Sequence, residues 1–197
     1  MTHKSHATLL MTGAAGGLGQ AMRTRLHENC DLLRLSDISP MAAAQAGEEV
    51  IQADLSDADA VQSLVAGCQA IVHFGGVSTE QPWGPILQAN IIGAYNLYEA
   101  ARIHGVKRVV FASSVAAFGG ELPAQVLDST APTPQGSYGI QKVIGELLVN
   151  DYSRRKFIDG RSIRLPTITV RPGKANKAAS SFASGIVREP LNGVEAI

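Results

Sequence analysis

The stretch Thr12-Gly13-Ala14-Ala15-Gly16-Gly17-Leu18-Gly19 decides the fold class of this chain. It follows a short aliphatic run, Ala7–Thr12, and opens a segment with helical spacing, Gly17–Glu28. Glycines at such a junction allow a tight turn, contact between helix and strand, and close approach of a phosphate to the backbone. The helix N-terminus adds unpaired N–H groups and a dipole that favours an anion. Glycine-rich turns also occur without a ligand, so the rest of the chain has to support this interpretation.

Short aliphatic runs alternate with longer helical segments along the whole chain. Strands are expected at Ala7–Thr12, Leu32–Leu35, Val50–Ala53, Ala70–Phe74, Arg108–Ala112 and Ser162–Leu165. Helices are expected at Gly17–Glu28, Asp57–Ala66, Asn90–His104, Tyr138–Lys156 and Ala178–Arg188, and loops at Gly119–Gly136 and Pro166–Lys177. Nearly all-apolar strands separated by helices predict an α/β fold: a Rossmann-type doubly wound parallel sheet in three layers, α/β/α.

Length and charge exclude several classes of protein. The chain has 197 residues, with 17 Lys and Arg balanced by 17 Asp and Glu, which predicts one domain, 1–197, with a substrate loop and terminal helix at 165–197. A chain without net charge lacks the basic surface that binds nucleic acid, and no apolar run reaches the roughly 18 residues of a membrane span. Cys30 and Cys68 form no disulfide pattern, which is typical of a cytoplasmic protein. We expect no metal site, because His3 and His6 have no further ligand nearby.

An acidic residue, Asp37, follows the second predicted strand, and no arginine adjoins it. An acid at this place accepts the ribose hydroxyls of a dinucleotide and would repel the extra phosphate of NADP, so we expect NAD as the cofactor. Asp37 could instead be a turn residue before Pro40, and Asp54 either flanks the adenine or caps a turn. The residues expected to contact the cofactor are Gly13, Gly16, Gly17, Leu18, Gly19, Asp37, Ile38, Ser39, Asp54, Leu55, Phe74, Gly75, Gly76, Asn90, Tyr138, Lys142 and Leu165.

Tyr138 and Lys142 stand four residues apart on one predicted helix, which places the phenol and the ammonium on the same face. An alcohol loses hydride only if its hydroxyl proton also leaves, and a tyrosine with a pKa of about 10 is a poor base at neutral pH. A nearby ammonium favours the phenolate, so we expect Lys142 to lower the pKa of Tyr138. Ser114, after the fifth predicted strand, can bind the substrate oxygen. The alternative is that Tyr138 is a packed aromatic residue and Lys142 a solvated surface residue.

These motifs resemble the extended short-chain dehydrogenase/reductase family, also described as NAD-dependent epimerases/dehydratases. The glycine pattern of the family matches Gly13, Gly16 and Gly19, and its catalytic triad is similar to Ser114, Tyr138 and Lys142. Ser114 and not Ser113 matches the catalytic serine of the family, because that serine lies five residues before the glycine that corresponds to Gly119. The resemblance implies hydride transfer from a substrate hydroxyl to NAD. It also implies a homodimer formed through the helix 90–104 and the helix that carries Tyr138.

Two enzyme families within this group resemble different parts of the chain. Up to about residue 115, the stretches 10–19, 33–41 and 73–80 are similar to uronate dehydrogenases. From about residue 116, the stretches 137–142, 164–167 and 170–182 are similar to D-erythronate dehydrogenases. Val115 and Ala116 replace an Asn-His pair of the uronate enzymes. Members of both families continue past the position matched by Ile197, so we expect a hybrid or C-terminally short chain with a truncated substrate region.

Both families oxidise a hydroxyl of a sugar acid, and a carboxylate with several hydroxyls needs cationic and hydroxyl groups around it. The substrate-binding residues expected on this basis are Ser78, Ser114, Thr167, Arg171, Asn176 and Lys177. Arg171 is the first choice for the carboxylate, which a guanidinium can bind through two hydrogen bonds, although it could equally face solvent beside Pro172. His73, at a strand end, is expected to be a hydrogen-bonded core residue and not a catalyst.

Two other functions remain open at this point. One is a nucleotide-sugar epimerase or dehydratase that uses the same triad. The other is a catalytically impaired module that binds NAD. The intact Ser114, Tyr138 and Lys142 favour an enzyme, and the resemblance favours a dehydrogenase acting on the CH–OH group of a sugar acid.

Overall fold

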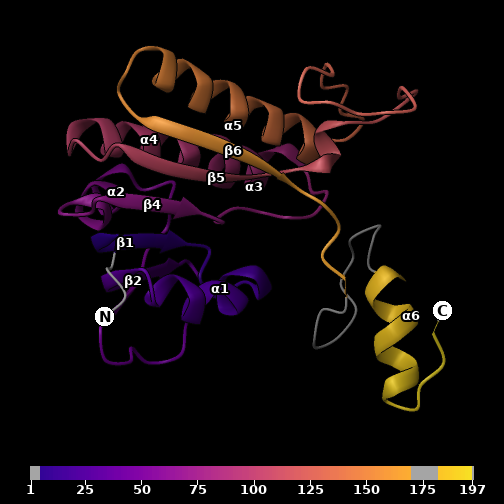
Figure 1. Ribbon diagram of the computed structural model, residues 1–197, viewed down its shortest axis with the longest axis horizontal. Helices are drawn as coiled ribbons and strands as arrows, with labels where there is room; N and C mark the ends of the chain where they lie inside the picture. The colour runs from indigo at the N-terminus through magenta and orange to yellow at the C-terminus, as the bar shows by residue number, and fades with distance from the viewer. Residues whose placement is uncertain (1–4, 170–181, 197) are drawn as a thin grey trace.

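A parallel six-stranded sheet forms the centre of the molecule (Figure 1). The computed structural model describes residues 5–169 and 182–196. The strands are β1 (His6–Thr12), β2 (Cys30–Asp37), β3 (Glu48–Gln52), β4 (Ala70–His73), β5 (Arg108–Ser114) and β6 (Asp159–Leu165). Their order is β3-β2-β1-β4-β5-β6, and every neighbouring pair is parallel. The strand order reverses between β1 and β4, which is where sheets of this kind open a crevice at their carboxyl ends.

Helices cover both faces of the sheet, as the sequence predicts. Helix α1 (Gly17–His27) packs on one face, where Met22 and Leu26 contact the cluster that contains Met11. Helices α2 (Ala58–Val65), α4 (Gly93–Ile103) and α5 (Ser137–Arg154) supply the opposite cluster, which contains Leu10. Leu10 and Met11 are both 0% exposed and point to opposite faces, because side chains alternate along a strand. The three-layer α/β/α arrangement is therefore confirmed.

The helix expected to begin at Asn90 begins earlier in the structure. Its backbone is helical from Trp83, first as α3 (Trp83–Ile86), then as the π-helix η1 (Leu87–Ile92), and then as α4. Gly84 and Pro85 indicate a loop in the sequence, but proline is tolerated in the first turn of a helix, where its missing N–H would have no partner. The wider π turn carries Asn90, whose side chain binds the backbone of Val77.

The edge strand β6 is longer than the apolar run Ser162–Leu165 predicts. Asp159 and Arg161 extend it, and the strand pairs with β5 from Arg108 to Ser114. Both added residues are exposed, because an edge strand can direct charged side chains to solvent. The apolar run in the sequence therefore indicates only the second half of this strand.

The C-terminal part of the described chain lies beside the main body. Helix α6 (Phe182–Leu191) stands apart from the sheet in Figure 1, and it overlaps the predicted helix Ala178–Arg188 from Phe182 onward. Within 5–169 and 182–196, no helix combines the length and the apolar character needed to cross a bilayer. Residues 118–136 contain neither helix nor strand, in agreement with the proline-rich loop predicted at Gly119–Gly136.

The turn between β1 and α1 requires glycine at two positions. Gly13 has φ +73°, and a Cβ there would lie 2.5 Å from the carbonyl carbon of Phe74. A Cβ on Gly19 would lie 2.3 Å from the carbonyl oxygen of Gly13. Both contacts are with backbone atoms, which cannot rotate away as a side chain can. The turn after β1 and the loop after β4 thus touch through their backbones.

This packing predicts that replacement of glycine by alanine destabilises the protein at one position of α1 and has little effect at another. Gly19→Ala places a methyl group against backbone and is expected to lower the free energy of unfolding by about 1–3 kcal/mol. Gly17→Ala meets nothing within 4 Å and is expected to change stability by about 0.5 kcal/mol or less. Urea denaturation of both variants measures the difference. Equal stability of the two variants would contradict the close contact at Gly19.

Candidate active site

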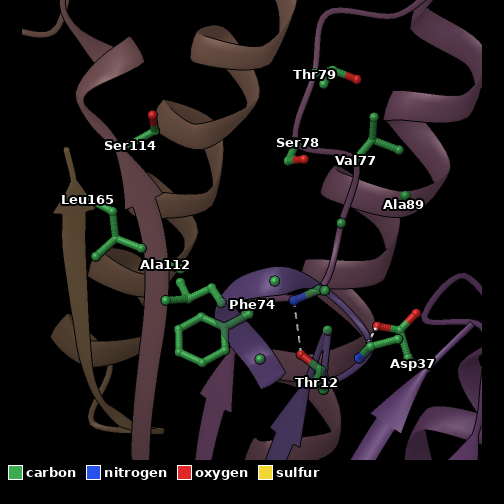
Figure 2. Close-up of a pocket in the computed structure, with 18 of the residues that line it drawn as sticks. Thr12, Asp37, Phe74, Val77, Ser78, Thr79, Ala89, Ala112, Ser114 and Leu165 are labelled. Atoms are coloured by element: carbon green, nitrogen blue, oxygen red, sulfur yellow. Dashed lines mark hydrogen bonds between the residues drawn. The ribbon is translucent and has the colours of Figure 1, made fainter. Parts of the chain in front are cut away.

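A cleft of about 1720 Å³ opens at the carboxyl ends of the strands. Its walls come from the turns and loops that follow all six strands, so residues far apart in the sequence meet there. Figure 2 shows Thr12 and Asp37 at one end of the pocket. Ser114 and Ser78 lie at the other end, on opposite sides of the pocket. This is the position where the strand order predicts a ligand.

Most of the residues selected from the sequence line this cleft. They are Gly13, Gly16, Gly17, Leu18, Gly19, Asp37, Ile38, Ser39, Asp54, Leu55, Phe74, Gly75, Gly76, Ser78, Ser114, Tyr138, Lys142, Leu165 and Thr167. Asn90 is not among the lining residues, because its side chain is turned to the backbone of Val77. Arg171, Asn176 and Lys177 lie outside the described residues. Arg188 of α6, which was not among the residues predicted for the site, also lines the cleft, and its guanidinium forms an ion pair with Glu189.

Asp37 connects the glycine turn to the end of β2. Its Oδ2 accepts a hydrogen bond from the N–H of Ala15 at 3.0 Å, and its Oδ1 accepts one from Ser39 at 2.9 Å. Asp37 thus makes the local turn considered as its alternative role, and it also lines the cleft. Asp54 behaves similarly: its Oδ1 accepts the N–H of Ser56 at 2.8 Å. Each carboxylate oxygen has further lone pairs with which to accept a ligand hydroxyl.

The floor of the cleft is held by a buried side-chain pair at the point where the strand order reverses. Thr12 Oγ1 lies 2.7 Å from His73 Nδ1 and accepts a hydrogen bond from the N–H of Gly75 at 3.3 Å. His73 is 1% exposed, and burial, together with the charge of Lys142, lowers its pKa to about 3. The ring is therefore neutral at physiological pH. His73 is a hydrogen-bonded core residue, as expected.

Ser114, Tyr138 and Lys142 come together at the end of β5 and the first turns of α5. The side chain of Ser114 lies close enough to the phenol of Tyr138 to lower its pKa. Ser114 Oγ also accepts the N–H of Ala116 at 3.1 Å. The ammonium of Lys142 donates to the carbonyl oxygen of Ala112 at 2.8 Å and lies 5.6 Å from the centre of the Tyr138 ring. All three side chains line the cleft, so the alternative of a packed Tyr138 and a solvated Lys142 does not describe this structure.

One electrostatic expectation differs from the structure. Burial raises the pKa of Tyr138, and only the hydrogen bond with Ser114 opposes this rise. Lys142 was expected to lower that pKa, but its ammonium is directed to Ala112 and is itself buried, which lowers its own pKa to about 8. In this arrangement Tyr138 is a protonated phenol at neutral pH.

A buried charged group behind Tyr138 and Lys142 holds α5 against the sheet. Glu146, one turn beyond Lys142, accepts two hydrogen bonds from Arg164 of β6, at 2.9 and 2.7 Å, and one from Ser113 Oγ. Burial opposes the ionisation of Glu146, but the hydrogen bonds from Arg164 and Ser113 outweigh it and lower its pKa. The helical spacing of Tyr138, Lys142 and Glu146 is visible in the sequence, but the pairing of Glu146 with Arg164 of β6 is not.

No group of three or more His, Cys, Asp or Glu side chains in the described parts of the chain is arranged to hold a metal ion.

Comparison with known proteins gives one family and two kinds of enzyme. A sequence model of the NAD-dependent epimerase/dehydratase family matches residues 9–195. The D-erythronate dehydrogenase of Cupriavidus necator is 46% identical over 95% of this chain and 63% of its own length. The uronate dehydrogenase of Pseudomonas putida is 49% identical over 87% of this chain and 65% of its length. The chain thus spans less than two thirds of either relative, and neither similarity is confined to one side of residue 116.

Solved structures show the same fold. A uronate dehydrogenase from Agrobacterium tumefaciens superposes with a TM-score of 0.73 at 50% identity, over 76% of this chain and 56% of that one. A mutant of an enzyme described in the same way was crystallised in complex with NAD, with 49% identity, a TM-score of 0.73, and 76% of this chain and 57% of that one covered. A protein from Agrobacterium tumefaciens described as a nucleoside-diphosphate-sugar epimerase has a TM-score of 0.88 at 40% identity, over 96% of this chain and 61% of that one.

The burial of Lys142 predicts a specific dependence of stability on pH. Its pKa is about 8 in the folded chain against an ordinary value of 10.5, so between these values the unfolded state binds the additional proton. The contribution of Lys142 to stability is therefore lowest below pH 8 and rises with pH. We expect the unfolding free energy of the wild type, relative to Lys142→Met, to rise by about 1 kcal/mol per pH unit from pH 8 to 10. Urea denaturation measures this, and a constant difference would contradict a buried ammonium.

Proposed function

This chain belongs to the NAD-dependent epimerase/dehydratase family, and on that premise we propose that it binds NAD and oxidises a hydroxyl group of a sugar acid of the uronate or erythronate type. The observation that carries the proposal is that Ser114, Tyr138 and Lys142 line the same cleft as the glycine turn and Asp37. A proton acceptor and a dinucleotide site in one cleft are the two requirements of alcohol oxidation. The relatives named for sugar-acid oxidation support the class of substrate.

The residues around the glycine turn fit NAD. Glycines occupy the place where the turn after β1 meets the loop after β4: Gly13 on one side, and Gly75 and Gly76 on the other. The backbone is therefore accessible there, and a pyrophosphate can approach it closely. The N-terminus of α1 adds unpaired N–H groups for the same anion. Asp37 would accept the adenosine ribose hydroxyls, and no cation adjoins it to bind a phosphate, which favours NAD over NADP.

In the proposed reaction, the triad handles the proton and orients the alcohol. NAD, when bound, supplies the acceptor for the hydride that leaves the carbon of the alcohol. Ser114 Oγ, which lies beside the phenol, binds the substrate hydroxyl. The hydroxyl proton passes to the oxygen of Tyr138 in its phenolate form. Because burial raises the pKa of this phenol, oxidation needs the ammonium of Lys142 to turn from Ala112 towards Tyr138, where it would favour the phenolate.

The sugar acid would lie between the triad and the loop after β4. Ser78 and Thr167, which carry hydroxyl groups, line the cleft, and so does the cationic residue Arg188, which is paired with Glu189. A carboxylate and several hydroxyls need such partners. Arg171, Asn176 and Lys177 remain proposed contributors from the segment that follows Thr169.

Replacing the phenol tests the proposed chemistry. Tyr138→Phe keeps the ring and removes the proton acceptor, so we expect kcat to fall at least about 100-fold while NAD binding in calorimetry is retained. Reduced nicotinamide is followed by absorbance with glucuronate, galacturonate and D-erythronate. Conversion of a nucleoside-diphosphate sugar by an epimerase or dehydratase leaves no net reduced nicotinamide, so this arm is followed by NMR of the sugar. Tyr98→Phe is the matched control, because the buried Tyr98 hydroxyl has no hydrogen-bond partner among the described residues.

Three outcomes would contradict this function. If the wild type turns over only the nucleoside-diphosphate sugar, it is an epimerase or dehydratase. If it binds NAD without turning over any acid, it is an impaired module. If Tyr138→Phe is as active as the wild type, another group accepts the proton.

We also propose that the protein forms a homodimer through α4 and α5. Both helices carry exposed apolar side chains: Tyr95 and Ile103 on α4 are 47% and 54% exposed, and Ile140 and Leu147 on α5 are 37% and 61% exposed. Burying such residues against a second copy removes apolar surface from water. Cys30 and Cys68 are both buried, and reduced thiols of this kind suit the cytoplasm, where we place the protein.

A charge placed on this surface should separate the copies. We expect sedimentation of the wild type to give a dimer at micromolar concentration and Leu147→Lys to give a monomer. Leu191→Lys, on the exposed face of α6, should leave the dimer intact. A monomeric wild type would refute the proposal.

A further inference from the structure

The N-terminus of α5, the helix that carries Tyr138 and Lys142, is not capped by the side chain of its own N-cap residue. Its N-cap residue is Gly136, which has no side chain with which to accept a hydrogen bond. The first N–H groups of a helix have no partner inside the helix and need one from elsewhere. A helix that has to present a reactive side chain in its first turn is therefore open to fraying at that turn.

Glu80 supplies the missing partner from the loop that follows β4. Its Oε1 accepts the N–H of Ser137 at 2.8 Å, and its Oε2 accepts the N–H of Tyr138 at 3.1 Å. A Cβ on residue 136 would lie 2.9 Å from Oε2, so the glycine there leaves space for the carboxylate. The hydrogen bonds from these N–H groups lower the pKa of Glu80, and the carboxylate is ionised at neutral pH. A negative charge at this end of a helix is also favoured by the helix dipole.

The same loop is attached to α5 a second time through Asn90. The side chain of Asn90 accepts the N–H of Val77 at 2.7 Å and donates to the carbonyl oxygen of Val77 at 2.9 Å. It also donates to Gln141 Oε1 on α5 at 2.6 Å. Residues 77–80 are thus fixed at both ends to the helix that carries Tyr138.

Ser78 and Thr79 lie between these two attachments and line the cleft. Figure 2 shows both on the loop, on the opposite side of the pocket from Ser114. Glu80 itself lines the cleft, so the cap lies within the site. The distance between the loop and the phenol is consequently set by the contact between Glu80 and α5.

We propose that Glu80 is a positioning residue, whose carboxylate caps α5 across the cleft and holds the Ser78–Thr79 side of the substrate pocket at a set distance from the Tyr138 hydroxyl. Its effect on turnover rests on the proposed function, whereas the cap itself does not. A carboxylate can accept both N–H groups at once, but an amide at the same place offers one acceptor oxygen and no charge.

The cap is tested first without any substrate. Hydrogen exchange of the Ser137 and Tyr138 amides is measured by NMR in the wild type, Glu80→Ala, Glu80→Gln and the control Glu121→Ala, which removes an exposed glutamate that does not line the cleft. We expect exchange at both amides to be at least tenfold faster in Glu80→Ala, intermediate in Glu80→Gln and unchanged in the control. Equal protection in wild type and Glu80→Ala would show that the cap is not formed in solution, and the proposal would fail.

The positioning role is tested by kinetics on the same variants. We expect Glu80→Ala to raise KM for the sugar acid about tenfold and to lower kcat, with Glu80→Gln between it and the wild type. The Kd for NAD should stay within twofold, because the glycine turn and Asp37 do not depend on Glu80. Faster exchange with unchanged kcat and KM would overturn the positioning role. A wild type that turns over no acid would overturn the proposed function, and the role of Glu80 in turnover with it, while the exchange data would still decide the cap.

Discussion

The close backbone contact between the turn after β1 and the loop after β4 is the constraint on which the rest of the site depends. Gly13 and Phe74 are so close that a Cβ at residue 13 would overlap the neighbouring backbone. The buried pair of Thr12 and His73 holds the two strand ends in register beneath that contact. Because β1 and β4 lie where the strand order reverses, their loops diverge above this point, and the cleft opens between them.

A second constraint places α5 relative to this cleft, and it is made largely of charged groups. Lys142 is bound to the carbonyl oxygen of Ala112, and Glu146 is bound to Arg164 and Ser113, so the helix is attached to the ends of β5 and β6 at two successive turns. Buried charges are tolerated only when they are paired or hydrogen-bonded, which makes these contacts selective for one position of the helix. Tyr138 then faces Ser114 without further adjustment.

The fold and the residues that line the cleft around the glycine turn could be predicted from the sequence because their signals are local. The glycine turn, the apolar strands and the helical spacing of Tyr138 and Lys142 each depend on residues that are close in the chain. The start of the helix at Trp83 and the first half of β6 were missed, since a proline in a first turn and charged residues on an edge strand imitate loop sequence. Asn90 was expected at the cofactor, but its partners, Val77 and Gln141, belong to separate elements.

What the sequence by itself determined was the class of fold, the glycine turn, Asp37 and the residue types of the triad, because turn geometry, strand burial and helical periodicity are properties of short segments. Only the tertiary structure decided how these groups act on one another. It directs the ammonium of Lys142 to Ala112 and leaves Tyr138 half-buried. The pKa of the phenol is therefore raised, although proximity along the helix predicts that it is lowered. The positions of Glu80 and Glu146 likewise follow from folding, because a side chain's partners and its exposure to water exist only once distant segments are packed together.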